Sequence, residues 1–205
     1  GGVMEEKEIC EHLDAKALKL LELFPEIYGS DCLRDYVADS MYFAGGCIYS
    51  LRHDRMPNDY DVFLRDDTLF ETIAGLDVWK HKSEYALSRG KFQLVTKFFG
   101  DPHDNVGEFD FKHNQYWYVP FSHRIESYQW DNTWDYLNTD TLLFNENRPR
   151  EVERVYARIP KFVKRGMKIS LATRVKILKR CALPTLIKEY YALNGKYVRS
   201  HGGGY

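Results

Sequence analysis

Two aspartates, Asp59 and Asp61, stand one residue apart at the start of an apolar run. Residues two apart on a strand point to the same side, so their carboxylates share one face. Two such anions repel each other unless a cation lies between them. Mg²⁺ prefers few carboxylates together with phosphate oxygens and water. The pair therefore indicates a metal site beside a polyphosphate. The calcium-loop alternative is disfavoured, because the further oxygen ligands and closing glutamate of such a loop are absent.

A glycine pair, Gly45 and Gly46, precedes the aspartates and follows a short apolar run. Without side chains, these residues let phosphates approach the backbone amides of the turn and of a helix start near Ile48. Ser50 can add a hydroxyl to the same place. A glycine pair alone is more often an ordinary turn. The glycine pair indicates a triphosphate site because it precedes the two aspartates along the chain.

A third carboxylate, Asp110, lies between two phenylalanines. Alternation along a strand would put both rings on one face and Asp110 on the other. Asp110 could then complete a two-metal site, in which one ion lowers the pKa of an acceptor hydroxyl and the other neutralises departing pyrophosphate. A surface aspartate at a strand end is the alternative.

These segments resemble a known enzyme family. The run FAGGCI at residues 43–48, followed by DYDV at residues 59–62, is similar to the head of CCA-adding tRNA nucleotidyltransferases and bacterial poly(A) polymerases, whose pattern is G-G-x-x-R-D and then D-x-D. This family belongs to the DNA polymerase beta-like superfamily. The run DFKHN at residues 110–114 resembles its R-R-D-F-T-x-N segment. The basic residues 148–166 more loosely resemble the arginine-bearing helix that closes the head.

The resemblance implies an α+β nucleotidyltransferase fold, with a mixed β-sheet flanked by helices and a small helical region after it. It implies transfer of a nucleoside monophosphate from a nucleoside triphosphate such as ATP to an acceptor hydroxyl, with release of pyrophosphate. The cofactor would be Mg²⁺ or Mn²⁺, and the favoured acceptor is an RNA 3′ end, especially that of tRNA. The implied catalytic and metal-binding residues are Asp59, Asp61 and Asp110. The implied nucleotide-binding residues are Gly45, Gly46, Ser50, Asn114, Arg154 and Arg158.

The sequence also departs from the family pattern. Tyr49 and Ser50 stand where the family has Arg-Asp, and Glu108 and Phe109 stand where it has paired arginines. Arginine contacts to phosphate and base are thus missing there, and Arg52, Arg55 or Arg154 are possible replacements. Three alternatives stay open for this reason: a same-fold enzyme of toxin or phage type that modifies a protein or small molecule, a non-catalytic nucleotide-binding module, and a structural domain with coincidental motifs.

Periodicity and turn residues predict the elements that must position these groups. The predicted helices cover residues 5–24, 31–39, 48–53, 66–76, 151–165, 171–181 and 186–193. The predicted strands cover residues 41–44, 60–64 and 109–111, with a hairpin formed by residues 78–87 and 92–99. Residues 100–107 read as a loop, and residues 115–134 show no clear period.

Composition fits one compact domain or a mixed domain with a helical appendage, because 44% of the 205 residues are hydrophobic and 15% aromatic. The formal net charge of -1 hides a strongly basic stretch at residues 148–180. We expect a nucleotidyltransferase head at residues 1–145 and a basic helical region with a flexible tail at residues 146–205. Arg150, Arg154 and Arg158 recur every four residues, as a solvated face or as a surface for a triphosphate or an RNA backbone.

Four scattered cysteines give neither a zinc-ribbon nor a disulfide pattern. No apolar run approaches the roughly 18 residues of a membrane helix. A soluble protein without a membrane partner is expected, located in the cytoplasm, or in the host cytoplasm if it is phage-encoded.

Overall fold

The computed structural model describes residues 2–148, 152–181 and 183–193. Contacts divide the chain into two compact units. The first comprises the residues up to Phe109 together with His113–Asn138, and the second comprises Asp110–Lys112 together with the described residues from Thr139 onward. Each unit is described by itself. The expected domain boundary after residue 145 stays a prediction.

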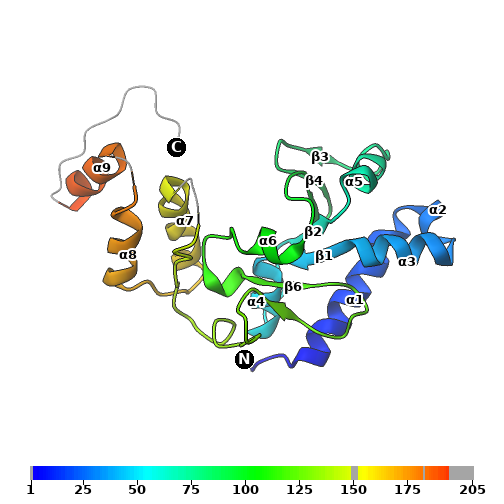
Figure 1. Ribbon diagram of the computed structural model, residues 1–205, viewed down its shortest axis with the longest axis horizontal. Coiled ribbons are helices and arrows are strands. Elements are labelled where there is room, and N and C mark those ends of the chain that lie inside the picture. The colour runs from blue at the N-terminus through cyan, green and yellow to red at the C-terminus, as the bar shows by residue number, and fades with distance from the viewer. Residues whose placement is uncertain (1, 149–151, 182, 194–205) are drawn as a thin grey trace. The chain divides into compact units, whose positions relative to one another are not determined.

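A mixed sheet organises the first unit. Within the described residues it contains seven strands in the order β3-β4-β5-β2-β1-β6-β7. Figure 1 labels the central strands β1 and β2 together with β3, β4 and β6. The strands are β1 (Met41–Ala44), β2 (Tyr60–Leu64), β3 (His81–Lys82), β4 (Ala86–Arg89), β5 (Phe92–Val95), β6 (Tyr116–Tyr118) and β7 (Glu126–Ser127). β2 and β5 run parallel, whereas the other neighbours are antiparallel. The predicted strands at 41–44 and 60–64 are confirmed. The predicted hairpin forms as β4–β5, but its first strand is shorter than predicted and extends to Arg89, and residues 81–82 form the separate strand β3.

Alternation along the strands gives this sheet two different faces. On one face Met41, Val62 and Leu64 pack with apolar residues of the helices near them. On the other face Tyr42, Ala44 and Phe63 form a second apolar cluster with four partly buried residues, which are Val95, Phe109, Trp117 and Val119. Asp61 alternates with Val62 and so belongs to this second face. We call it the aspartate face, defined by Ala44, Asp61 and Phe63.

Four helices of the first unit were predicted from the sequence, and three of them begin within one residue of the predicted start. The described helices of this unit are α1 (Glu6–Glu22), α2 (Pro25–Tyr28), α3 (Asp31–Ser40), α4 (Gly46–Arg52), α5 (Asp67–Ala74) and α6 (Pro102–Val106), followed by the 3₁₀ turn η1 (Lys112–Asn114), whose first residue belongs to the second unit. The Ser30 side chain caps α3, and the Asp66 carboxylate accepts from the backbone N–H of Thr68 and Leu69 at the start of α5. Pro25 was expected only to end the first helix, but it also opens α2, where its missing N–H costs nothing.

Two predictions about residues 100–111 were wrong. The expected loop contains α6, because the Asp101 side chain accepts from the His103 backbone N–H at 2.9 Å and Pro102 occupies the first helical turn. The expected strand at 109–111 does not form. Phe111 makes only an isolated bridge with Phe144, and Asp110 is in no strand. Apolar and polar side chains alternate over these three residues as in a strand, but they do not form a continuous hydrogen-bonded ladder with a neighbouring strand.

The second unit is helical, with α7 (Val152–Lys164), α8 (Leu171–Leu178) and α9 (Leu183–Leu193). Buried Val155, Ile159 and Phe162 form the apolar stripe of α7, and the Phe162 ring meets that of Phe111 at 5.2 Å. The three predicted helices are thus confirmed, although their ends differ by a few residues.

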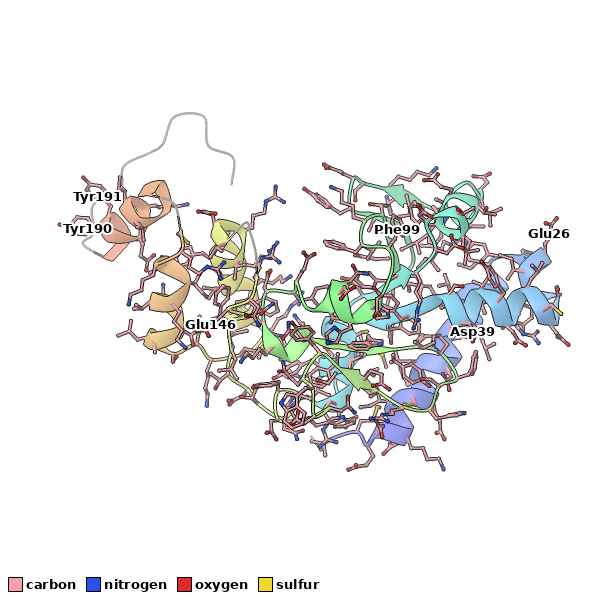
Figure 2. The ribbon with its side chains drawn as sticks, in the orientation of Figure 1. Glu26, Asp39, Phe99, Glu146, Tyr190 and Tyr191 are labelled. Atoms are coloured by element: carbon pink, nitrogen blue, oxygen red, sulfur yellow. The ribbon has the colours of Figure 1, made fainter. Side chains whose placement is uncertain are left out.

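Figure 2 labels three side chains of this unit, Glu146, Tyr190 and Tyr191. Glu146 pairs with Lys176 of α8 at 3.0 Å, and the two tyrosine rings of α9 lie 5.5 Å apart. Arg150, the first member of the predicted arginine stripe, falls outside the described residues. Among the described helices, none has both the length and the apolar character needed to cross a bilayer.

Candidate nucleotide and metal site

The carboxylate of Asp61 lies directly at the glycine turn. Antiparallel pairing of β1 and β2 sets Ala44 opposite Asp61. The next residue, Gly45, leads into α4 with φ 84 and ψ -146, a backbone region essentially reserved for glycine. A Cβ on Gly45 would lie 3.5 Å from Asp61 Oδ2. The two sequence motifs, 16 residues apart, therefore meet in one place.

Asp59 stands at the entrance of β2, one residue before the strand begins. Tyr60, between the two aspartates, is 0% exposed, whereas Asp59 is exposed and Asp61 is half-buried. A buried residue between two accessible ones is the pattern of an extended segment with one side in the core. This burial pattern supports the expected placement of both carboxylates on one side.

Tyr60 anchors the start of β2 to α1. Its hydroxyl and His12 Nε2 share a hydrogen bond of 2.7 Å, and the two rings stack at 5.8 Å. Burial raises the pKa of Tyr60 to about 12. Burial, and next the charge of Lys16, lowers the pKa of His12. The contact therefore joins two neutral groups. Sequence reasoning missed it, because 48 residues separate the partners.

Helix α4 presents one accessible side to solvent. It begins at Gly46, two residues before the predicted start at residue 48, so the amides of Gly46 and its neighbours open the helix. Ser50 follows Gly46 by four residues and lies on the same side of the helix. Gly46 is exposed and Ser50 half-buried, whereas Cys47 and Ile48 between them are buried. Burial, and then the Asp61 charge, raises the pKa of the Cys47 thiol above its usual range, which keeps it protonated.

The departure at Tyr49 has a structural reason. Tyr49 is buried, and its ring lies 4.3 Å from that of His53 and 4.8 Å from that of His113. The position where the family pattern has arginine is thus part of the core here. Arg55 is exposed on the loop after α4, with its guanidinium 6.0 Å from the Tyr49 ring centroid.

Arg52, a possible replacement for the missing arginines, is held by other groups. It donates to the Asn138 side chain at 2.9 Å and to the Met4 carbonyl at 3.1 Å, and its guanidinium lies over the Trp134 ring. These contacts fasten the end of α4 to the rest of the first unit. Arg52 therefore has a structural role.

Asn114 ends η1, beside His113, whose ring contacts Tyr49 of α4. The Asn114 Oδ1 atom is buried and has no hydrogen-bond partner within the described residues. A buried acceptor left unsatisfied costs about 1–3 kcal/mol. Such an atom is a candidate for a bond to a ligand, which agrees with the predicted role of Asn114.

The remaining predicted residues belong to the second unit. Arg158 makes a bidentate pair with Asp110, with Nε at 2.6 Å and Nη2 at 3.0 Å. Arg148 Nη1 lies 3.1 Å from the same carboxylate. Two guanidinium groups therefore pair with the Asp110 carboxylate within this unit. Arg154 is exposed on α7. The metal-binding role of Asp110 stays a prediction.

The groups of the first unit fit a divalent cation carried by a triphosphate. Among the described residues, no cluster of three or more His, Cys, Asp or Glu side chains forms. The structure places the Asp61 carboxylate at the glycine turn, and Asp59, two residues earlier, is expected on the same side of the extended segment. Mg²⁺ accepts such a set, since it keeps waters and takes its other ligands from substrate phosphates.

Solved structures share this fold at low sequence identity. A structure described as a tRNA-processing enzyme (apo form I) has a TM-score of 0.51 and 15% identity, and the alignment covers 89% of this chain and 52% of that one. The Bacillus stearothermophilus CCA-adding enzyme in complex with CTP has a TM-score of 0.50 and 14% identity, covering 80% of this chain and 42% of that one. This chain thus spans about half the length of these enzymes. The protein has the nucleotidyltransferase head fold, as its sequence motifs predict.

No curated protein matches the sequence. A family match does cover residues 14–139, more than half of the chain. That segment contains the glycine turn, Asp59, Asp61, Asp110 and Asn114, but neither Arg154 nor Arg158. The protein belongs to the Gabija anti-defense 2 family.

Proposed function

We propose that the protein is a metal-dependent nucleotidyltransferase that moves a nucleoside monophosphate from a nucleoside triphosphate to an acceptor hydroxyl. The acceptor oxygen bonds to the α-phosphorus, the bond to pyrophosphate breaks, and the hydroxyl proton is lost to solvent. The observation that carries this proposal is the 3.5 Å approach between Asp61 Oδ2 and a Cβ position on Gly45. It joins a cation-binding group to a phosphate-binding turn.

Each predicted site residue of the first unit has a part in this reaction. Asp59 and Asp61 hold Mg²⁺ or Mn²⁺, which when bound neutralises charge on the triphosphate and acidifies the acceptor hydroxyl. The amides at Gly45 and Gly46 and the Ser50 hydroxyl hold phosphate oxygens. Asn114 contacts the nucleotide through its unsatisfied oxygen. Catalysis of this kind is mostly positioning and electrostatic stabilisation.

The first candidate acceptor is the 3′ end of an RNA, in particular tRNA. The second unit supports it through exposed cations at the end of α7, which are Lys161, Lys164 and Arg165. Such residues attract a phosphate backbone. Arg154 and Arg158 add to the same helix. We propose that Arg154 contacts the phosphate backbone of the RNA and that Arg158, through its pair with Asp110, holds α7 in place within the second unit.

The second candidate acceptor is a protein, and the family membership favours it. A member of an anti-defense family is expected to alter a component of a defence system. Nucleotide attachment to a protein hydroxyl would do so with the same chemistry at Asp59 and Asp61. The acceptor side of the reaction distinguishes the two candidates, whereas the metal and triphosphate side is common to them.

A labelling experiment tests the proposal. The protein is incubated with each α-³²P-labelled nucleoside triphosphate and Mg²⁺, together with a tRNA transcript lacking its terminal CCA and a lysate of cells that carry the Gabija system. We expect label in RNA or in protein, and a loss of at least about 1,000-fold in Asp61→Asn. Asp54→Asn is the matched control, because Asp54 is an exposed neighbour whose φ of 53 suits asparagine.

Undiminished labelling by Asp61→Asn would refute the assignment. Metal-dependent triphosphate binding without labelled product from any acceptor would instead favour a non-catalytic nucleotide-binding module.

A further inference from the structure

The sheet register places an amide beside the aspartates. On β2, Asp61 stands opposite Ala44 of β1 on one side and opposite Gln93 of β5 on the other. Gln93 in turn stands opposite Ser88 of β4. Residues in register on neighbouring strands point to the same face and lie about 4.8 Å apart. Ala44, Asp61, Gln93 and Ser88 therefore form one row across the aspartate face.

A second observation confirms the direction of Gln93. Val95, two residues further along β5, packs into the apolar cluster of the aspartate face with Phe63 and Tyr42. Strand alternation then puts Gln93 on that face too, while Leu94 between them is buried on the opposite one. Gln93 and Ser88 are both half-buried. They are accessible polar groups beside a metal-binding carboxylate.

The two ends of this row lie on opposite sides of Asp61, and only one of them adjoins the turn proposed to hold the triphosphate. The glycine turn follows β1, on one side of β2, whereas Gln93 and Ser88 lie on the other side, on β5 and β4. In phosphoryl transfer the attacking and leaving oxygens lie roughly in line, on opposite sides of the phosphorus. With pyrophosphate held at Gly45 and Gly46 on the β1 side of Asp61, an in-line attack along this row brings the acceptor hydroxyl from the β5 side.

We infer that Gln93 and Ser88 form the acceptor subsite, with the Gln93 carboxamide hydrogen-bonded to the acceptor that brings the attacking hydroxyl. The inference rests on the proposed function and adds the place of the second substrate. An amide both donates and accepts hydrogen bonds and carries no charge. It can therefore bind a hydroxyl without adding a third anion beside Asp59 and Asp61. The negatively charged phosphates of an RNA acceptor are then not repelled by a further carboxylate.

The position of Gln93 is tested by metal binding, independently of turnover. Mn²⁺ is titrated in the presence of CTP and followed by electron paramagnetic resonance. Gln93→Glu places a third carboxylate beside the pair, so Mn²⁺ should bind about tenfold more tightly. Thr72→Glu, on the exposed side of α5, adds the same charge elsewhere and should leave the affinity unchanged. Equal affinities in the two variants would overturn the inference.

The acceptor role is tested with the tRNA transcript lacking its CCA end. Gln93→Ala should raise the KM for the transcript about tenfold while the Kd for CTP stays unchanged, because the lost hydrogen bond belongs to the acceptor alone. An equal rise in both constants, or no rise in KM, would overturn the subsite.

The two levels of failure are separable. If the unaltered protein binds Mn²⁺ no more tightly than Asp61→Asn does, the proposed function itself is refuted. Intact Mn²⁺ binding without transfer to the transcript excludes RNA as the occupant of the subsite, while the Gln93→Glu titration still decides where Gln93 points.

Discussion

At the scale of single residues, the two neighbouring glycines of the proposed site have different conformations. Gly45 has a positive φ and faces Asp61. Gly46 opens α4, and apart from its chain neighbours and its own helix backbone no atom of the described residues lies within 4 Å of the place that a Cβ would occupy. The sequence treats them as one motif. The backbone conformation of Gly45 requires glycine. That of Gly46 would also accept another small residue.

Substituting each glycine with alanine measures this difference. Gly45→Ala should lower the free energy of unfolding by about 1–3 kcal/mol, because alanine is strained in that conformation. It should also weaken MgCTP binding, since the turn must shift to relieve the strain. Gly46→Ala should keep full stability, because alanine is the better helix former. Chemical denaturation and calorimetric titration follow the two effects. Equal behaviour of the variants would show that the turn is not constrained.

A second residue-scale prediction concerns pH. Burial lowers the pKa of His12 from its ordinary 6.5, so below that pH the unfolded chain binds a proton that the folded chain resists. The contribution of neutral His12 to the free energy of unfolding is complete above about pH 6.5. It is lost as the pH falls toward the pKa of His12 in the folded chain. We expect Tm to drop over this range in the unaltered protein and to drop less in His12→Gln, which keeps a polar partner for Tyr60 but does not titrate. Parallel Tm curves would contradict this account.

At the scale of elements, the sequence predicted the strands and helices that carry the motifs, because each has a strong local signal. β1 and β2 are apolar runs bounded by turn residues, and Ser30 and Asp66 announce the helices that they cap. Residues 109–111 alternate equally well but form no strand, because strand formation depends on a neighbour that local sequence does not reveal. The position of Gln93 beside Asp61 was not predicted for the same reason, since it follows from register.

Helix α6 gives an element-scale prediction. Asn105 is 7% exposed, and its side-chain nitrogen donates to the Tyr42 hydroxyl at 2.9 Å and to the Phe98 and Phe99 carbonyls at 3.3 Å. Asn105→Ala should cost about 2–4 kcal/mol, since it leaves buried acceptors unsatisfied beside a small cavity. Asp104→Ala, on the exposed side of α6, should cost less than about 0.5 kcal/mol. Denaturant unfolding measures both, and similar losses would contradict the proposed bridging role.

At the scale of the whole molecule, the chain leaves the first unit and returns to it: residues 110–112 belong to the helical second unit, although both flanking segments belong to the first. Asp110 lies in this short segment and forms salt bridges with both Arg148 and Arg158. The sequence predicted Asp110 at the metal site as a third carboxylate from a neighbouring strand. The partners lie 38 and 48 residues away along the chain, beyond the reach of local pattern.

Asp110→Asn distinguishes the structural role from the predicted metal role. The structural role predicts a loss of about 1.5–3 kcal/mol, typical of hydrogen bonds to charged groups, with Mn²⁺ affinity unchanged. Calorimetric unfolding and Mn²⁺ titration of the same sample give the answer. Lost Mn²⁺ binding at full thermal stability would return Asp110 to the metal site.

The central claim, that Asp59 and Asp61 hold a divalent ion beneath a triphosphate resting on the glycine turn, is tested most directly by crystallography. Crystals soaked with Mn²⁺ and a non-hydrolysable CTP analogue should show anomalous density between the two carboxylates, with the phosphates against the amides of Gly45 and Gly46. An analogue bound elsewhere, or carboxylates that point apart with no ion between them, would contradict it.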